Sequence, residues 1–277
     1  GLAIARALAL KGREVVVIER NPWIGNETSS RNNEVVHAGF LYPPQSLRGQ
    51  LCHPGAQSLM TYCDARGIEL ARRGKLILAL DDAQAAMLET MLEAGAACDV
   101  SGLEILPPAS VRQREPELQC HAALYSPETA VVDSHAYMLA LQGDGEDAGA
   151  VIAFNSAVTR GSIADDKPTV SVASADGDMD LDCDVVINAA GLGAADIAHK
   201  FAALPSEHVP KMHYSKGRFM SYGGKVPFEH IVVPLGDTLA MGGALTLDIA
   251  GRAKFGPDHD WVEEIDYDLP DGLAPQF

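Results

Sequence analysis

The sequence predicts an α/β fold, α+β overall, and three observations lead to that prediction. Residues 1–12 carry apolar and small side chains at helical spacing and end at Gly12, which suits the left-handed turn after a helix. Residues 15–18 form a continuous β-branched run, typical of a strand buried on both faces of a parallel sheet. Residues 184–196 repeat the strand-like pattern and then run through small residues and glycine into a second helix.

The run at 15–18 ends at Glu19, and this acid indicates what the helix and strand are for. A carboxylate at the end of the second strand of a βαβ unit can accept hydrogen bonds from both ribose hydroxyls of an adenine dinucleotide. Gly1 stands where the third glycine of G-x-G-x-x-G would be, and Glu19 follows at about the expected ~20 residues. Because the first strand and two glycines would precede Gly1, we expect the chain to be a fragment. The alternative is any amphipathic helix followed by any buried strand.

The composition is that of a globular protein, because 47% of the 277 residues are hydrophobic and 21% are charged. This length allows one large domain or two interleaved ones. The net charge of -17 argues against a nucleic-acid partner, and an anionic substrate would need a few local cations. The five cysteines form no C-x-x-C pair, which favours reduced thiols in a cytoplasmic protein and argues against a metal site. No apolar run reaches the ~18 residues that span a bilayer.

The segment 21–39, directly after this strand, is rich in glycine and small polar residues and predicts a loop with many exposed hydrogen-bond donors. A loop at the carboxyl end of a parallel strand lines the ligand crevice of doubly wound sheets. Ser29, Ser30 and Asn32 are therefore candidates for ligand contacts, with ordinary turn chemistry as the alternative. His37 interrupts an apolar run, where a histidine is more often a hydrogen-bonded core residue than a catalyst.

Further helices and strands are predicted from capping residues and apolar periodicity. The helices begin after Ser46, at Asp81 or Asp82 and near Ser134, and Gly67 ends the first of them. Strands are expected at 74–80, 123–125, 130–133, 151–152, 211–222, 230–234 and 239–247, with a hairpin of 167–172 and 178–182 around Asp176-Gly177. Residues 105–117 indicate a connecting loop and a short helix. The acidic tail after residue 261 is expected to lack a closing element.

The spacing of glycine, alanine, leucine, valine and glutamate in residues 1–19 resembles the fingerprint of the glutathione-reductase-like flavoproteins. Further stretches resemble the D-amino-acid-oxidase-like family of FAD-dependent oxidoreductases, and within it the group that acts on L-2-hydroxyglutarate. These stretches are Asn-Asn-Glu-Val-Val-His-Ala-Gly at 32–39, Gly-Lys-Leu-Ile at 74–77, Val-Val-Asp at 131–133, Ala-Ala-Gly-Leu at 189–192, Tyr-x-Lys-Gly at 214–217 and Leu-Thr-Leu-Asp at 245–248. Their order over nearly the whole chain makes the resemblance more specific than the first nineteen residues alone.

The resemblance implies an FAD-binding, Rossmann-like domain of the glutathione-reductase type that interleaves with an antiparallel-sheet substrate domain. The FAD-binding domain would use residues 1–73 and 131–203 and lack its first strand. The substrate domain would use residues 74–130 and 204–277, cover the flavin ring and lack its C-terminal part.

The resemblance also implies roles for particular residues. Gly1 belongs to the pyrophosphate turn, Glu19 to the adenosine ribose, and Val158 to the adenine through its backbone. His37 would lie by the isoalloxazine, and in some relatives a histidine in this region carries the flavin covalently. The complete set of cofactor-binding candidates is Gly1, Glu19, Arg20, Ser29, Ser30, Asn32, His37, Val158, Ala190 and Gly191.

The activity implied is oxidation of a 2-hydroxy acid, L-2-hydroxyglutarate to 2-oxoglutarate, by hydride transfer to the flavin N5. His37 is the candidate base because its unperturbed pKa lies near neutrality. Arg31, Lys216 and Arg218 are candidate anchors for the substrate carboxylates, with surface solvation as the alternative. One departure from the pattern is Ala244, since a histidine often precedes the Leu-Thr pair in the family.

The sequence leaves two other functions open. One is FAD-dependent oxidation of a small amino acid or a secondary amine, and the other is a truncated remnant without catalysis. The electron acceptor is also open between a quinone, oxygen and an electron-transfer flavoprotein. A cytoplasmic location is expected, with peripheral association with the inner membrane as the alternative.

Overall fold

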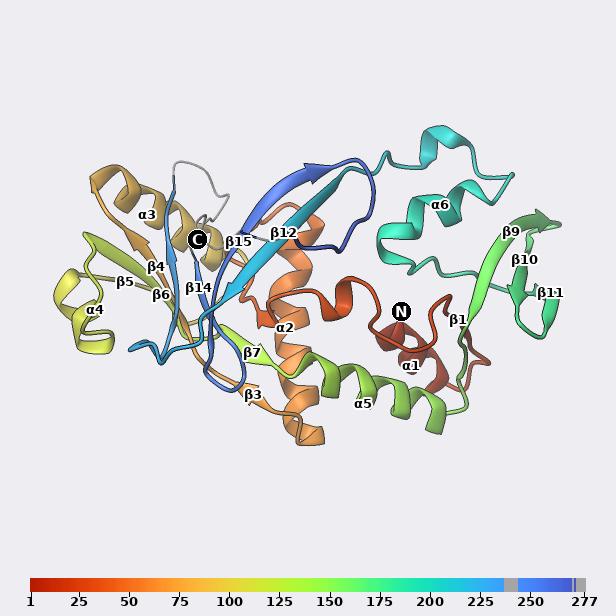
Figure 1. Ribbon diagram of the computed structural model, residues 1–277, viewed down its shortest axis with the longest axis horizontal. Coiled ribbons are helices and arrows are strands. Elements are labelled where there is room, and N and C mark those ends of the chain that lie inside the picture. The colour runs from red at the N-terminus through yellow and green to blue at the C-terminus, as the bar shows by residue number, and fades with distance from the viewer. Residues whose placement is uncertain (237–243, 271, 273–277) are drawn as a thin grey trace. The chain divides into compact units, whose positions relative to one another are not determined.

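The computed structural model describes residues 1–236, 244–270 and 272 (Figure 1). It divides into two compact units, each formed by two stretches of chain. The first unit comprises Gly1–Asn32 and Ser134–His213, and the second comprises Asn33–Asp133 and Tyr214–Phe277.

The compact units and the expected domains divide the chain at different residues. Segment 33–73 packs with the second unit because β2 (Val35–Val36) and β3 (Leu70–Ala71) both pair with β7 (Ala130–Val132) in one three-stranded sheet. Neither division shows by itself which residues bind the cofactor. The assignment of cofactor and substrate to the two domains therefore stays a prediction.

The first unit contains the helix and the strand expected at the start of the chain, but Val16 is 47% exposed, so the strand is not buried on both faces as expected. α1 (Leu2–Ala9) ends in a turn where Gly12 has a φ of 72°, and β1 (Val16–Ile18) follows. β1 pairs in parallel with β8 (Val151–Ala153), and α5 (Ser134–Asp147) packs against α1. The parallel pair β1–β8, with α1 before the first strand and α5 before the second, agrees with the predicted α/β arrangement.

An antiparallel sheet of three strands follows β8. Its strands are β9 (Ser156–Ala164), β10 (Lys167–Ser174) and β11 (Gly177–Asp182), arranged in the order β11-β10-β9. The β10–β11 hairpin confirms the prediction, and β9 was not predicted because Gly161 and exposed polar residues interrupt its apolar pattern. The unit also contains η2 (Gly191–Gly193), the expected helix α6 (Ala194–His199) and η3 (Ser206–His208).

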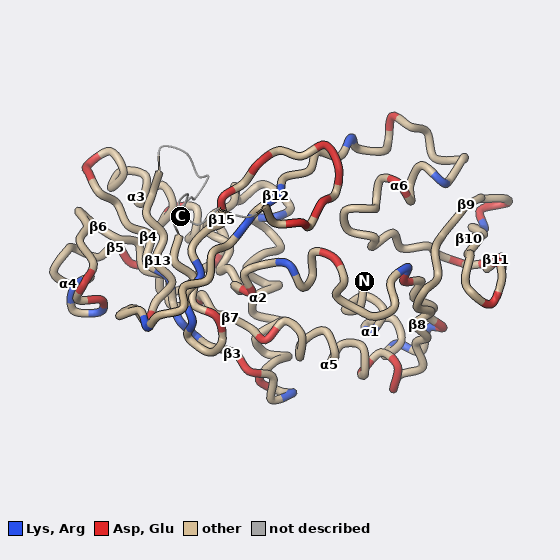
Figure 2. Tube along the Cα trace, in the orientation of Figure 1, with Lys and Arg blue, Asp and Glu red and all other residues tan. Residues whose placement is uncertain are grey.

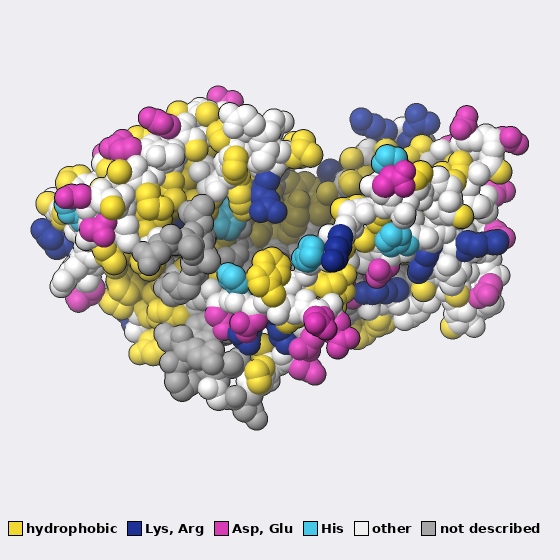
Figure 3. All heavy atoms as spheres, turned by 90° about the horizontal axis from the view of Figure 1, so that it is seen from above, with side chains coloured by type: hydrophobic (Ala, Val, Ile, Leu, Met, Phe, Trp, Pro, Cys, Tyr) yellow, Lys and Arg dark blue, Asp and Glu magenta, His cyan; other side chains and the backbone are white. Residues whose placement is uncertain are grey.

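Residues 184–187, which were expected to form a buried strand, are neither buried nor in a strand. Val185 is 72% exposed, and Val186 and Ile187 are also exposed. A strand needs a hydrogen-bonding neighbour, and in the described chain β1 and β8 pair only with each other. The run keeps its β-branched composition but has no sheet to join. Other apolar side chains also reach the surface, as the face shown in Figure 3 illustrates.

A seven-stranded sheet forms the centre of the second unit. Neighbouring strands pair antiparallel except β13 and β4, which run parallel, so the antiparallel-sheet prediction is confirmed with one exception. The order is β12 (Tyr214–Ser221), β15 (Ala253–Val262), β14 (Leu245–Leu247), β13 (Ile231–Pro234), β4 (Lys75–Ala79), β6 (Ala122–Ser126) and β5 (Glu104–Leu106). β14 matches the end of the strand expected at 239–247, of which residues 239–243 lie outside the described residues. β15 was not predicted.

Two helices of this unit begin and end where the sequence predicts. Ser46 caps α2 (Leu47–Arg66) by accepting a first-turn amide at 3.0 Å, and Gly67 ends it with a φ of 65°. Asp81 caps α3 (Asp82–Ala97) in the same way at 2.8 Å. Along the described part of the chain, no helix combines the length and the hydropathy that crossing a bilayer requires.

Strand β4 lies in the middle of the core, and every one of its residues is buried. Its side chains alternate between two apolar clusters, with Ile77 beside Leu88 of α3 on one face and Leu76 beside Val111 on the other. Lys75 begins this strand and is only 2% exposed. A charged side chain therefore enters an otherwise apolar layer.

A buried carboxylate joins two distant segments of the second unit. Glu115 directly follows α4 (Pro108–Arg114), and it is 1% exposed. Its Oε1 accepts hydrogen bonds from the backbone N of Glu229 at 2.9 Å and of His230 at 2.8 Å, and lies 2.6 Å from His230 Nδ1. Glu115 thus holds the segment that leads into β13.

Candidate active site

Glu19 lies at the carboxyl end of β1, as expected for a ribose ligand. Its backbone N donates to the Ala153 carbonyl at 2.9 Å, and its own carbonyl accepts from Ser156 N at 3.0 Å, so the backbone is fixed on both sides. Its Oε1 accepts from the backbone N of Asn21 at 2.8 Å and from Asn21 Nδ2 at 2.9 Å. Within the described residues Oε2 has no hydrogen-bond partner, so the carboxylate has acceptor capacity left for a ligand.

Gly1 lies at the start of α1, where its carbonyl accepts from Ile4 N and Ala5 N at 3.0 Å. No side chain caps this helix, so the amides of its first turn remain available to an anion such as a pyrophosphate. No described atom outside the neighbouring residues lies within 4 Å of the position that a Cβ atom on Gly1 would take. Together with Glu19, these features fit the adenosine and pyrophosphate parts of an FAD molecule.

The loop after β1 carries the next three candidates. Ser29 and Ser30 lie in the short turn η1 (Thr28–Ser30), and both are exposed. Arg20 forms an ion pair with Glu27 of the same loop at 2.6 Å. The hydroxyls are therefore at the surface, whereas the guanidinium is occupied by a local carboxylate.

Arg31 and Asn32 stabilise this loop from within. The Arg31 guanidinium donates to the carbonyls of Asn26 and Glu27. Asn32 Nδ2 donates to the carbonyls of Thr28 and Ser29 at 3.1 and 2.9 Å. These contacts favour the turn-chemistry alternative for Asn32 and show that Arg31 binds the backbone of its own loop, although this backbone can still present donors to a ligand.

Val158, Ala190 and Gly191 lie on two segments of the first unit. Val158 is on β9, and its carbonyl accepts a hydrogen bond from Lys200 Nζ. Ala190 and Gly191 form an exposed bend in which Gly191 has a φ of 56° and no atom within 4 Å of a Cβ position. The bend is open enough for a ligand to approach its backbone.

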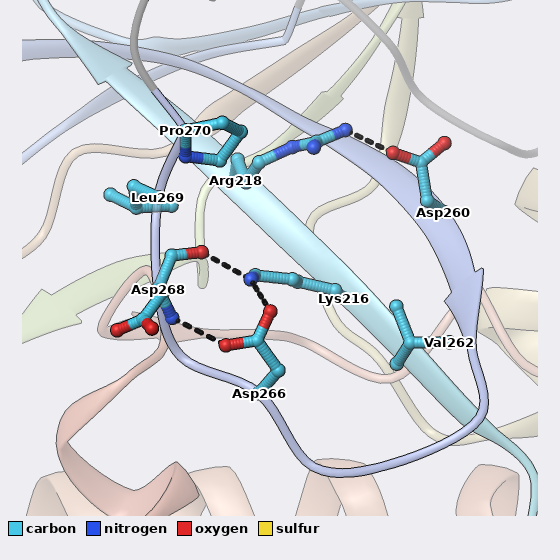
Figure 4. A pocket seen from close by; sticks show the side chains of 8 residues that line it. All are labelled: Lys216, Arg218, Asp260, Val262, Asp266, Asp268, Leu269 and Pro270. Carbon is cyan, nitrogen blue, oxygen red and sulfur yellow. Dashed lines mark hydrogen bonds and ion pairs between the residues drawn. The ribbon is translucent and has the colours of Figure 1, made fainter.

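Lys216 and Arg218, the expected substrate anchors, lie on β12 and line an open hollow of about 400 Å³ (Figure 4). Both are already paired with carboxylates: Lys216 Nζ is 2.6 Å from Asp266, while Arg218 contacts both oxygens of Asp258 at 3.0 Å. The hydrogen bond from Arg218 holds the pKa of the Asp258 carboxyl below its usual range. Acidic residues run along β15 and the segment after it (Figure 2), so a carboxylate ligand would compete with them here.

His37 follows β2 and is partly exposed. Its Nδ1 lies 3.1 Å from Lys75 Nζ, and its carbonyl accepts a weak hydrogen bond from the Cys52 thiol at 3.5 Å. In the described structure Nε2 has no hydrogen-bond partner. One edge of the ring is therefore held by the core, and the other edge is available to a ligand.

Lys75 is the functional candidate that the sequence reading did not single out. It stands in the Gly-Lys-Leu-Ile stretch, but lysines are rarely buried without a carboxylate, so nothing in the pattern indicated a buried ammonium group. The signal for a buried lysine was its place at the start of a strand in which every residue is buried. Burial lowers the pKa of Lys75 to about 8, against the opposing influence of Cys52.

The pKa of His37 differs from the near-neutral value that the sequence suggested. Burial, and then the charge of Lys75, lower the pKa of His37 to about 3. The imidazole is therefore neutral throughout the physiological range. Because the imidazolium of His37 gives up a proton readily, a proton that His37 accepts must pass to a second acceptor.

The depressed pKa of His37 predicts an acid-sensitive fold. Between the folded value of about 3 and the ordinary 6.5 the unfolded chain binds the extra proton, so stability is complete above 6.5 and is lost as the pH falls. In the wild type we expect the free energy of unfolding to fall by about 1 kcal/mol per pH unit below 6.5. In His37→Gln we expect this fall to be absent. Urea unfolding of the wild type and the variant at several pH values measures it, with exposed His208→Gln as the matched control. Parallel pH curves for the wild type and His37→Gln would contradict the prediction.

Comparison with known proteins relates the whole chain to one group of enzymes. The profile of the DAO family, described as FAD dependent oxidoreductase, matches residues 1–275. The chain is 35% identical to the mitochondrial L-2-hydroxyglutarate dehydrogenase of Arabidopsis thaliana over 96% of its own length and 61% of the relative. It is 28% identical to the Homo sapiens enzyme of that name over 76% of its own length and 47% of the relative. The chain thus spans less than two thirds of the length of these relatives.

Solved structures share the fold at low identity. The dithionite-reduced L-α-glycerophosphate oxidase of Mycoplasma pneumoniae with FAD bound matches with a TM-score of 0.87 and 19% identity, over 99% of this chain and 73% of that one. The glycine oxidase of Geobacillus kaustophilus matches with a TM-score of 0.78 and 18% identity, over 99% of this chain and 72% of that one. These matches confirm the predicted fold class, and the family match extends over nearly every residue. The chain therefore belongs to the DAO family of FAD-dependent oxidoreductases.

Proposed function

We propose that the protein oxidises L-2-hydroxyglutarate to 2-oxoglutarate. The observation that carries the proposal is the 35% identity to the Arabidopsis thaliana dehydrogenase, which extends over 96% of this chain. When bound, FAD supplies the acceptor for the hydride that leaves C2 of the substrate. The protein then has to hold the cofactor, orient the substrate and accept the hydroxyl proton.

The first unit supplies the residues for the cofactor. Glu19 would accept hydrogen bonds from the ribose hydroxyls through Oε2, and the amides at the start of α1, next to Gly1, would bind the pyrophosphate. Ser29 and Ser30 offer exposed hydroxyls to the phosphates or the ribityl chain. The remaining cofactor candidates are Arg20, Asn32, the Val158 backbone, Ala190 and Gly191.

The second unit supplies His37 as the candidate proton acceptor, through its unpartnered Nε2. Lys216 and Arg218 remain candidate anchors for the substrate carboxylates, and binding there requires the substrate to displace the paired aspartates. Arg31 is the weaker candidate, since its guanidinium already donates to the backbone of its own loop.

The test is a substrate comparison with the FAD-loaded full-length protein and an artificial dye as electron acceptor. We expect turnover with L-2-hydroxyglutarate and formation of 2-oxoglutarate. Faster turnover with glycerol 3-phosphate would favour the activity named for a Caloramator mitchellensis relative that is 25% identical over 93% of this chain. Release of ammonia from glycine would favour amine oxidation instead.

The physiological acceptor and location belong to the same proposal. A quinone, oxygen or an electron-transfer flavoprotein could reoxidise the flavin, and anaerobic and aerobic assays with each acceptor separate them. Each of the five cysteines is free, which supports a reducing, cytoplasmic compartment. Peripheral association with a membrane would accompany a quinone acceptor.

Glu19→Gln tests the cofactor site separately from catalysis. Loss of the charge removes the stronger acceptor for the ribose hydroxyls, and we expect FAD affinity to fall about tenfold, or ~1.4 kcal/mol. FAD titration of the apoprotein, followed by flavin fluorescence, measures the change. Glu14→Gln, at an exposed acid shortly before β1, is the matched control. An unchanged dissociation constant in Glu19→Gln would remove this residue from the ribose site.

A further inference from the structure

Lys75 is a buried cation without a buried anion. It is 2% exposed, and among the described residues no carboxylate lies within ion-pair distance of its Nζ. In the sheet its neighbours are Ser126 of β6 and Ile231 of β13, and neither of these side chains is charged. Its ammonium group instead reaches His37 Nδ1 at 3.1 Å and lies 5.9 Å from the centre of the Phe40 ring. The imidazole is therefore its principal polar partner.

The chemistry of this contact links the proton on Lys75 to the tautomer of His37. An ammonium group can only donate, so a charged Lys75 requires the lone pair of His37 on Nδ1 and the ring proton on Nε2. A neutral amine has a lone pair and can accept Nδ1–H, which leaves the lone pair on Nε2. Only the second arrangement allows the free edge of His37 to accept a proton from a substrate hydroxyl.

We propose that Lys75 is a positioning residue that acts through His37: its neutral form permits the imidazole tautomer that accepts a proton at Nε2, and its Nζ takes the proton that leaves Nδ1. This inference rests on the proposed function. The net transfer moves one proton from the substrate hydroxyl to Lys75. The O–H, C2–H and Nδ1–H bonds break and the Nε2–H and Nζ–H bonds form. The O–H electron pair becomes the second C–O bond of the product, and the C2–H pair would leave as the hydride that FAD accepts when bound.

Burial and charge support this division of roles. The pKa of His37 is lowered to about 3, so the imidazolium is a poor final acceptor for the proton. The pKa of Lys75 is lowered to about 8, so the neutral amine is accessible near neutrality and its ammonium form holds a proton well. Cys52 of α2 is the other titratable group that acts on Lys75. Burial is the first cause that raises the pKa of the Cys52 thiol, and the charge of Lys75 opposes it.

Nitrogen-15 NMR of histidine-labelled full-length protein tests the link directly. His37→Asn identifies the signals of His37 among the nine histidines. We expect the wild type to change from the Nε2–H to the Nδ1–H tautomer with a midpoint at about pH 8 and without an imidazolium signal. Lys75→Arg, which stays charged, should hold the Nε2–H tautomer at every pH, and Lys75→Met should abolish the change. Lys167→Met, at an exposed lysine, is the matched control.

A second readout is the pH dependence of kcat/KM. The wild-type value should rise about tenfold per pH unit below a midpoint near pH 8, and this rise should be absent in Lys75→Arg. A wild-type tautomer that stays constant from about pH 6 to pH 10, or one that changes in the same way in Lys75→Met, would overturn the inference. The NMR measurement needs no substrate, so failure of the proposed function and failure of this inference are distinguishable.

Discussion

His37→Ala should lower kcat/KM for L-2-hydroxyglutarate by about 10²-fold or more. The substitution removes the side chain that is placed to accept the hydroxyl proton, and it leaves the buried ammonium group of Lys75 facing an empty space. FAD should still bind, because the residues that fit its adenosine half belong to other segments. Steady-state kinetics with the dye acceptor and an FAD titration of the same preparation measure both quantities.

Chemical rescue separates a proton acceptor from a structural role for His37. Added imidazole should restore part of the His37→Ala rate, since the removed ring leaves room for it beside Lys75. His208→Ala, at an exposed histidine of η3, is the control that should retain the wild-type rate and show no response to imidazole. A rate for His37→Ala within a factor of about two of the wild type would exclude His37 as the acceptor.

Helix boundaries were predictable because they depend on local chemistry. Ser46 and Asp81 accept first-turn amides, and Gly12 and Gly67 take left-handed conformations, so helix boundaries follow from single residues. The position of Glu19 at the end of β1 was predictable for a related reason, because it directly follows the β-branched run. Interactions over a few residues are visible in a sequence.

Interactions between distant residues were not predictable in this way. Lys75 meets His37 across 38 residues, and Lys216 meets Asp266 across 50, so neither pairing leaves a local pattern. The pKa expected for His37 depended on its own side chain alone, whereas in the structure burial, and then that distant lysine, lower it. Residues 184–187 show that a local pattern can also mislead. They have the composition of a strand, but among the described residues they pair with no neighbouring strand and form none.

Glu115→Ala should lower the free energy of unfolding by about 3 kcal/mol. Its Oε1 receives two backbone amides and faces a histidine nitrogen, and the group is almost completely removed from water. The variant would leave these donors buried and without an acceptor, which costs more than the hydrogen bonds themselves contribute.

The size of that effect depends on burial, and the chain offers a direct comparison for it. Glu117 lies two residues further on and is exposed, so Glu117→Ala should change the free energy of unfolding by less than about 0.5 kcal/mol. Glu115→Gln keeps an acceptor oxygen but loses the charge, and we expect an intermediate loss. Urea denaturation of the three variants measures the series. Equal losses for Glu115→Ala and Glu117→Ala would mean that α4 and the segment before β13 are held together by apolar packing alone, and that the carboxylate is dispensable.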